Sequence, residues 1–142
     1  MSAYADTSFI GSLYLLDSNS NLAAARTAEE KPPILLSSLG ELELMNALQL
    51  HVFSKEIRDS DLHAAVASFR ADVDSGMLVI KPMSDAIYVE ALRLSTHWSW
   101  RLGTRSLDIL QVAAAIVLGA ESFHTFDLRQ KKLAKAAGLV CR

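Results

Sequence analysis

The chain has 142 residues, of which 51% are apolar and 21% charged, so it can bury a core of its own and is not a disordered chain. Cys141 is its only cysteine, which excludes an internal disulfide and a zinc cluster built on cysteines and fits a reducing cytoplasm. No signal-peptide pattern opens the chain and no apolar run approaches the roughly 20 residues that span a bilayer, so we expect a single cytoplasmic domain over residues 1–142, without membrane contact.

Short apolar runs predict about five strands, which alternate with helical patterns along the chain. In chain order, the strands are expected at residues 3–5, 34–36, 77–80, 122–126 and 139–140. Helices are expected after Asp6 and then over residues 21–30, 38–53, 59–75, 85–98, 107–118 and 128–137. The residues predicted to cap these helices are Asp6, Ser37 or Ser38, Ser84, Ser106 and Asp127.

The alternation of strands and helices predicts an α/β fold, because parallel strands need crossover connections that place helices on both faces of the sheet. We expect three α/β/α layers around a small parallel sheet of about five strands, with right-handed crossovers. Binding sites in open parallel sheets lie at the carboxyl ends of the strands. Asp6 and Asp127 directly follow two of the expected strands, so both fall at this edge.

Three acidic residues at helix starts each have a structural explanation. Asp6 and Asp127 can accept hydrogen bonds from the first turn of a helix, and Gln130 stands at capping-box spacing from Asp127. Asp108 lies in the first turn of its expected helix, where the helix dipole stabilises a carboxylate by roughly 0.3–1 kcal/mol. Taken singly, none of these residues needs a catalytic role.

A glutamate on an apolar helix is harder to explain in this way. Glu43 shares a helix face with Ala47 and Leu50, and a buried carboxylate must be neutralised, paired or bound to a cation. Glu41 lies on an equally apolar face, with Met45 among its neighbours, so the spacing of apolar residues leaves both glutamates open.

Carboxylates that meet at one edge of a sheet repel one another, and without a counterion some of them stay protonated. A divalent cation removes this conflict, and carboxylate oxygens suit hard ions such as Mg²⁺ or Mn²⁺. The histidines show no i, i+4 ligand pair and no link to a cysteine, which favours surface or supporting roles over zinc binding. They are His51, His63, His97 and His124.

The net charge of −2 hides an uneven distribution along the chain. Residues 1–100 carry 7 basic and 13 acidic residues, whereas residues 101–142 carry 7 basic and 3 acidic residues. Such asymmetry can place a basic face on a nearly neutral protein. Charge alone nevertheless favours a simpler explanation, in which a few solvated lysines lie on a terminal helix.

Three stretches resemble the PIN-domain family and follow one another in the order in which that family carries them. The first two are Ala5-Asp6-Thr7-Ser8 and Leu36-Ser37-Ser38 with Glu43-Leu44-Met45-Asn46-Ala47-Leu48. The most specific stretch comprises Arg105-Ser106-Leu107-Asp108-Ile109-Leu110, Ala113-Ala114-Ala115, Gly119-Ala120, Phe123, Thr125-Phe126-Asp127, Arg129-Gln130, Leu133-Ala134 and Gly138-Leu139. It is similar to the C-terminal half of VapC-type toxins of bacterial toxin–antitoxin pairs, and the resemblance spans essentially the whole chain.

The resemblance implies a site that the pattern of residues left open. It selects Glu43 rather than Glu41 as the second acid. The implied catalytic residues and ligands of Mg²⁺ or Mn²⁺ are Asp6, Glu43, Asp108 and Asp127. Of these, Asp127 occupies the position that the family requires least strictly.

Hydroxyl groups near the acids have an implied supporting role. Thr125 matches a hydroxyl position of the family, and Thr7 or Ser8 can act in the same way. One departure is Gln111, which stands one helical turn after Asp108 where many relatives have histidine. It removes no metal ligand but changes the surroundings of the site.

The resemblance implies an endoribonuclease that hydrolyses RNA phosphodiester bonds with water activated by Mg²⁺ or Mn²⁺. The residues expected to hold the RNA backbone through phosphate contacts are Arg105, Arg129, Lys131, Lys132 and Lys135. It also implies a homodimer and a cognate antitoxin that lays a helix in an apolar groove.

Two other functions are considered. The alternative is a PIN-like binding module that holds an antitoxin or nucleic acid with little or no turnover, in which the acids serve only as helix caps. A phosphoacceptor receiver domain is disfavoured, because it needs adjacent acids after the first strand and here Thr7 and Ser8 follow Asp6.

Overall fold

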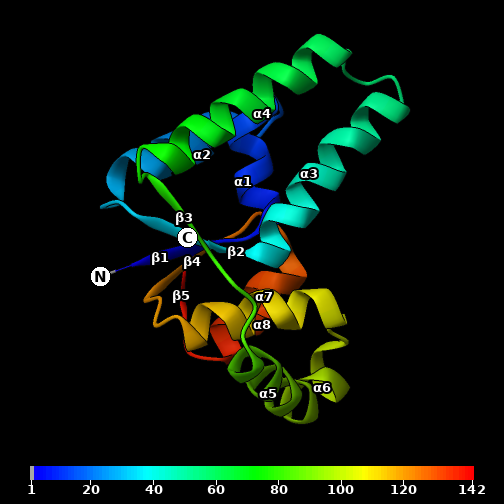
Figure 1. Cartoon of the computed structure of the whole chain (residues 1–142). Helices are drawn as coiled ribbons and strands as arrows, with labels where there is room; N and C mark the ends of the chain where they lie inside the picture. The colour runs from blue at the N-terminus through cyan, green and yellow to red at the C-terminus, as the bar shows by residue number, and fades with distance from the viewer. Residues whose placement is uncertain (1) are drawn as a thin grey trace.

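Five parallel strands form one sheet in the computed structural model, which describes residues 2–142 (Figure 1). In chain order the strands are β1 (Ala3–Ala5), β2 (Ile34–Ser37), β3 (Leu78–Lys81), β4 (Ser122–His124) and β5 (Val140–Cys141). Their order across the sheet is β3-β2-β1-β4-β5, so the chain begins in the central strand and is extended on both sides of it. The predicted α/β fold with a small parallel sheet is confirmed.

Helices cover both faces of this sheet (Figure 1). Those on one face are α1 (Thr7–Tyr14), α2 (Ser20–Glu29), α3 (Ser38–Phe53) and α4 (Asp59–Asp74). Those on the other face are α5 (Asp85–Leu94), the π-helical turn η1 (Ser95–Ser99), α6 (Trp100–Leu102), α7 (Ser106–Val117) and α8 (Leu128–Ala136). The three predicted layers are therefore present. Among residues 2–142, no helix combines the length and the apolar character that crossing a membrane requires.

Side-chain alternation along the central strands builds one hydrophobic core on each face of the sheet. Tyr4 and Leu35 belong to the core under α5, α7 and α8, whereas their neighbours Ala5 and Leu36 belong to the core with α1, α3 and α4. A strand buried on both faces needs apolar residues at successive positions, which is why β1 and β2 appear as short continuous apolar runs.

The register of β1 and β4 places two distant segments side by side at the carboxyl edge of the sheet. Ala5 pairs with His124, and the Asp6 N–H donates to the His124 carbonyl oxygen at 3.1 Å. The residues that follow these strands, Asp6 and Thr125, therefore leave the sheet together. This edge is the one at which the sequence predicts a site.

The last two strands differ from their predicted bounds. β4 ends at His124 and not at residue 126, because the following backbone is bound by a side chain: the Phe126 N–H donates to Ser8 Oγ at 2.9 Å. The closing strand begins at Val140, one residue later than predicted.

Predictions for two helix starts and one helix end also need correction. Ser106 is the first residue of α7 and does not cap it; Arg105 holds the cap position with an extended backbone. Ser84 holds the cap position of α5, but its side chain makes no capping hydrogen bond. By contrast, Ser37 caps α3 by accepting a hydrogen bond from the Gly40 N–H at 3.1 Å. The helix predicted over residues 85–98 divides into α5 and the wider turns of η1.

Candidate active site

The Asp6 carboxylate is buried at the carboxyl end of β1, where only 2% of the residue is exposed. Its Oδ1 accepts hydrogen bonds from the Ser8 hydroxyl at 2.7 Å and from the Phe9 N–H at 3.0 Å, which caps α1. Its Oδ2 accepts a hydrogen bond from the Thr125 hydroxyl at 2.5 Å. The predicted cap is therefore present, and both oxygens of Asp6 are held by groups from two separate segments.

The Glu43 carboxylate is held by side chains of two other helices. Its Oε1 accepts hydrogen bonds from the Thr7 hydroxyl at 3.1 Å and from the Gln111 amide at 2.6 Å. Glu41 instead forms an ion pair with the exposed side chain of Arg70, with 2.5 Å between nitrogen and oxygen. The structure thus separates the two glutamates that apolar spacing left open.

The starts of α7 and α8 carry the remaining two acids. Asp127 caps α8 as predicted, since its Oδ1 accepts hydrogen bonds from the N–H groups of Arg129 at 2.9 Å and Gln130 at 3.2 Å. The Gln130 side chain does not complete a capping box; it donates to the main-chain oxygen of Asp108 at 3.5 Å. Asp108 is half-buried in the first turn of α7, so this bond links the two helix starts.

Electrostatic coupling links the four carboxylates in pairs. Burial raises the pKa of Asp6 to about 6, and repulsion from Asp127 adds to this shift against the hydrogen bonds that lower it. Burial also raises the pKa of Asp108, with further repulsion from Asp127 and from Glu43. Because Coulomb repulsion falls with distance, such coupling requires the acids to lie near one another.

Several carboxylate oxygens at this edge have no protein partner. Glu43 Oε2, Asp127 Oδ2 and both carboxylate oxygens of Asp108 accept no hydrogen bond from residues 2–142. Within the same residues, no three Asp, Glu, His or Cys side chains are gathered closely enough to hold a metal ion as they stand. The chemistry of the free oxygens and the mutual repulsion nevertheless fit Mg²⁺ or Mn²⁺. Binding of such an ion by the four acids stays a prediction.

The basic residues predicted to contact RNA lie in two places. Arg105 and Arg129 lie close enough to the Asp108 carboxylate to lower its pKa, whereas burial raises it. Lys131 and Lys135 lie close to Cys141 of β5, where they lower the thiol pKa that burial raises. The third lysine of α8 is exposed. The two arginines are therefore the cations beside the acids.

His124 is fully buried at the end of β4. Of the surface and supporting roles expected for the histidines, the surface role is therefore wrong for this residue. Its Nε2 lies 2.8 Å from Glu30 Oε1, and its ring packs on Phe9 with 4.8 Å between ring centroids. Its Nδ1 has no hydrogen-bond partner among residues 2–142, and burial lowers the pKa of the ring. The signal that could have shown this is its place in a strand expected to be buried on both faces.

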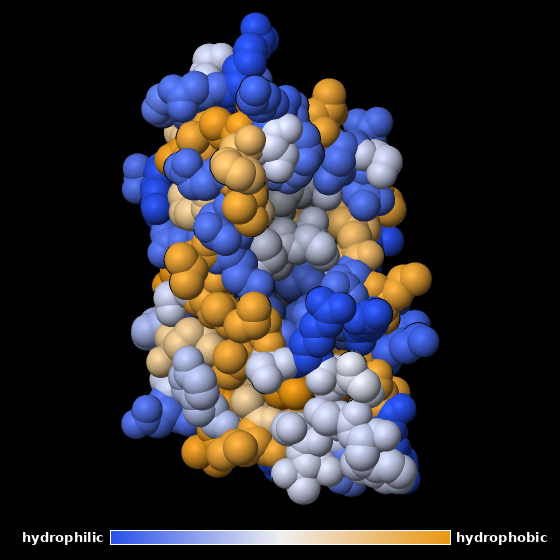
Figure 2. All heavy atoms as spheres, turned by 90° about the vertical axis from the view of Figure 1, so that its right-hand side faces the viewer, coloured by the Kyte–Doolittle hydropathy of each residue, from blue (hydrophilic) through white to orange (hydrophobic). Residues whose placement is uncertain are grey.

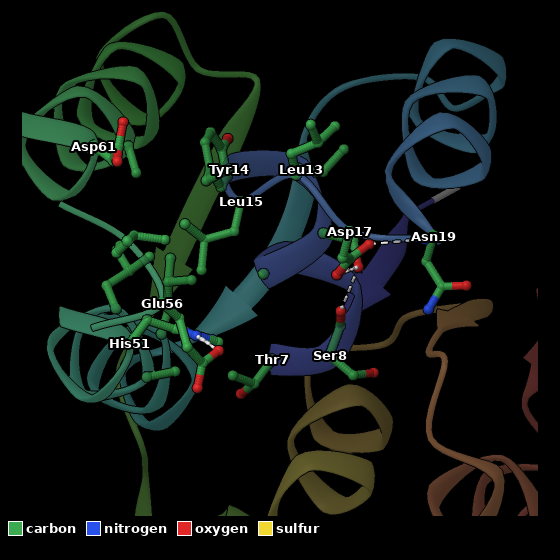
Figure 3. Close-up of a pocket in the computed structure, with 18 of the residues that line it drawn as sticks. Thr7, Ser8, Leu13, Tyr14, Leu15, Asp17, Asn19, His51, Glu56 and Asp61 are labelled. Carbon is green, nitrogen blue, oxygen red and sulfur yellow. Dashed lines mark hydrogen bonds and ion pairs between the residues drawn. The ribbon is translucent and has the colours of Figure 1, made fainter. Parts of the chain in front are cut away.

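A groove of about 1060 Å³ lies between α1, α3 and α4 and reaches the candidate site. Leu13, Ala47 and Ala64 are among its lining residues, while Thr7 and Asp127 lie at the end near the acids. Figure 3 shows Thr7 below and Leu13 above in this groove. The strands in Figure 1 run toward its right-hand side, and Figure 2 shows that face hollowed at mid-height, with hydrophilic side chains below the hollow.

Comparison with known proteins identifies the family. Residues 3–136 match the model of the PIN domain, so the chain belongs to the PIN-domain family, as the sequence motifs indicated. None of the curated proteins compared with the chain matches it. The family assignment therefore rests on the family model and agrees with the fold.

Solved structures share this fold at low sequence identity. VapC20 of Mycobacterium tuberculosis, described as a sarcin-ricin loop cleaving toxin, is 21% identical over 97% of this chain and 96% of that chain, with a TM-score of 0.71. VapBC-1 from nontypeable Haemophilus influenzae is 14% identical over 100% and 97%, with a TM-score of 0.70. VapBC2 from Rickettsia felis, bound to a DNA fragment from their promoter, is 18% identical over 100% and 98%, with a TM-score of 0.67. These likenesses establish a shared fold.

We predict that Asp6→Asn removes a pH-dependent loss of stability in the metal-free protein. The pKa of Asp6 rises from 3.8 to about 6 on folding, so its contribution to stability is complete below pH 3.8 and is lost as the pH rises through about 6. Between pH 4 and pH 7.5, the wild type should lose roughly 3 kcal/mol in free energy of unfolding relative to the variant. Urea unfolding at a series of pH values measures this difference.

The matched control is Asp74→Asn, which changes an exposed aspartate at the end of α4. This variant should follow the pH dependence of the wild type. Parallel curves for the wild type and Asp6→Asn would contradict the prediction.

Proposed function

We propose that the chain is a metal-dependent endoribonuclease that acts in the cytoplasm as the toxin of a toxin–antitoxin pair. The observation that carries this proposal is the electrostatic coupling that links four carboxylates in pairs at the carboxyl edge of a PIN-family fold. They are Asp6, Glu43, Asp108 and Asp127. The description of VapC20 as a toxin that cleaves the sarcin-ricin loop supports RNA as the substrate class.

The acids divide into held and free groups in this proposal. A bound Mg²⁺ or Mn²⁺ supplies positive charge that helps to deprotonate the attacking water and offsets the charge that develops on the phosphate. Asp6 and Glu43 are held by hydrogen bonds, so they offer oxygens in fixed positions. Asp108 and Asp127 are half-buried, and between them they keep three carboxylate oxygens that accept no hydrogen bond from residues 2–142.

Arg105 and Arg129 hold the RNA backbone beside the acids. A guanidinium group can bind a phosphate with two parallel hydrogen bonds, and such contacts fix the register of the RNA without reading its sequence. The lysines of α8 extend the positive charge away from the site. They are Lys131, Lys132 and Lys135.

The groove between α1, α3 and α4 is the proposed site of a cognate antitoxin. It is lined by apolar side chains such as Leu13 and Leu48 together with polar ones such as His51, and such a mixed lining suits an amphipathic helix laid along it. The neighbours VapBC-1 and VapBC2, described as VapBC, support an antitoxin as the partner. Thr7 and Asp127 at the inner end bring such a partner close to the acids.

A homodimer is proposed through α5 and α7. Leu92 on α5 is 70% exposed and Leu107 on α7 is 51% exposed, and Tyr88 and Val89 of α5 are exposed as well, so the two helices present several apolar side chains to solvent. A hollow of about 370 Å³ between the two helices is lined by Leu92, Ile109 and Leu110. Apolar patches of this kind mark interfaces, and a two-fold axis brings two identical patches together.

Cleavage of a structured RNA with Mg²⁺ or Mn²⁺ tests the nuclease proposal. Asp6→Asn and Asp108→Asn should each reduce the cleavage rate at least about a hundredfold, because each removes an anionic oxygen from the site. Asp85→Asn is the matched control, since Asp85 is an exposed aspartate in the first turn of α5, and it should cleave like the wild type. Equal rates for all variants would falsify the site.

Calorimetric titration with Mn²⁺ distinguishes the nuclease from the alternative function, a binding module with little or no turnover. In that module the acids only cap helices, so Mn²⁺ should release no binding heat.

Co-expression with candidate antitoxins, meaning small DNA-binding proteins encoded beside this gene, tests the groove. Ala64→Glu places a long charged side chain in the groove, where it blocks the partner, and should abolish co-purification of the antitoxin. Ala67→Glu is the control, because Ala67 is also an exposed alanine of α4 but does not line the groove. Undiminished co-purification with Ala64→Glu would contradict this binding site.

Light scattering tests the homodimer. The wild type should have twice the mass of the 15.5 kDa chain, and Leu92→Glu should have the mass of one chain. Ala86→Glu, at an exposed position of α5 outside the hollow, should stay dimeric. A wild type of 15.5 kDa, or a dimeric Leu92→Glu, would exclude this interface.

A further inference from the structure

Gln111 is a buried amide at the back of the candidate site. Only 2% of the residue is exposed, and it lies on α7 one turn after Asp108. We propose that Gln111, held in place by a hydrogen bond from Tyr4, is a positioning residue that holds the Glu43 carboxylate for the cation. This inference rests on the proposed nuclease function.

The hydrogen bonds of Gln111 define how its amide is turned. The Tyr4 hydroxyl donates to Gln111 Oε1, which can only accept. The Gln111 amide nitrogen donates to Glu43 Oε1 at 2.6 Å and lies 3.3 Å from Thr7 Oγ1. With the amide reversed, its oxygen would face the carboxylate oxygen of Glu43 and repel it. The Glu43 carboxylate, which only accepts, therefore fixes the orientation of the amide, and the hydrogen bond from Tyr4 to its oxygen holds the amide in that place.

Tyr4 is itself held rigidly in the central strand. The residue is fully buried, its ring stacks on Phe123 with 5.6 Å between centroids, and its hydroxyl lies 2.9 Å from Ser37 Oγ. A rigid donor transmits its position to the amide it binds. The series from Tyr4 through Gln111 to Glu43 thus connects the middle of the sheet to a carboxylate on α3.

The same contacts leave one oxygen of Glu43 available. Both hydrogen bonds from Thr7 and Gln111 reach Oε1, and Oε2 accepts none from residues 2–142. A glutamate side chain has several rotatable bonds, so an unsupported carboxylate samples many positions. Fixing Oε1 restricts where Oε2 can lie. The expected effect of Gln111 is therefore on cation affinity and not only on stability.

Calorimetric titration with Mn²⁺ measures this effect independently of RNA cleavage. Gln111→Leu should weaken Mn²⁺ binding about 10–100-fold, the range found for residues that orient metal ligands. Tyr4→Phe keeps the ring and removes only the hydroxyl, so it should fold and should weaken Mn²⁺ binding in the same direction by a smaller factor. In the Gln111→Leu background, Tyr4→Phe should cause no further loss of affinity, because it acts through the amide.

Two controls separate positioning from a general loss of structure. Gln49→Leu changes an exposed glutamine on α3. Tyr14→Phe removes a hydroxyl that donates to Asp72 Oδ2 at 2.6 Å and makes no contact with the four acids. Both should bind Mn²⁺ like the wild type. Circular dichroism with urea unfolding shows which variants are folded.

The outcomes distinguish this inference from the proposed function. If the wild type binds Mn²⁺ and Asp6→Asn abolishes binding, but Tyr4→Phe and Gln111→Leu bind like the wild type, the positioning role is overturned and the nuclease site stands. Additive losses from Tyr4→Phe and Gln111→Leu would also overturn the role of Tyr4 acting through the amide. A wild type that binds no Mn²⁺ overturns the proposed function and this inference with it.

Discussion

The hydrogen bonds that surround the buried Asp6 carboxylate are the interactions on which the rest of the site depends. The bond from Thr125 spans 119 residues of sequence and joins the ends of β1 and β4. Burying a carboxylate is costly, and the bonds offset only part of the cost, since the pKa of Asp6 still lies at about 6. The fold therefore keeps an incompletely compensated negative charge at the carboxyl edge of the sheet, with the other acids around it.

Two neighbouring residues of α1 each donate a hydrogen bond to a different carboxylate. The Thr7 hydroxyl donates to Glu43, whereas the Ser8 hydroxyl donates to Asp6. Successive residues of a helix point about 100° apart, so each hydroxyl can face a different acid. One turn of α1 thus fixes an acid from the end of β1 relative to an acid on α3. The Ser8 oxygen also accepts the Phe126 N–H, which ties the segment after β4 to the same turn.

The strands, the helix caps at Asp6 and Asp127 and the edge of the sheet that carries the acids could be predicted from local sequence. Each of these features depends on residues that lie close together in the chain. Long-range polar partners could not be predicted in this way. Apolar spacing shows which face of a helix is buried but not which side chain meets it, so it could not separate Glu43 from Glu41. Likewise, no local pattern joins Gln111 to Tyr4 across 107 residues.

Capping a helix and binding a cation are compatible tasks for the Asp127 carboxylate, because they can use different oxygens. Asp127 directs Oδ1 to both N–H groups of the first turn of α8 and leaves Oδ2 free. The N-terminus of a helix stabilises negative charge, and a metal ligand must be ionised, so the position favours both tasks. A structural explanation for an acid at a helix start therefore does not weigh against a catalytic one. Asp127 is thus placed both to cap α8 and to offer Oδ2 to a cation, whereas both oxygens of Asp6, which caps α1, accept hydrogen bonds within the fold.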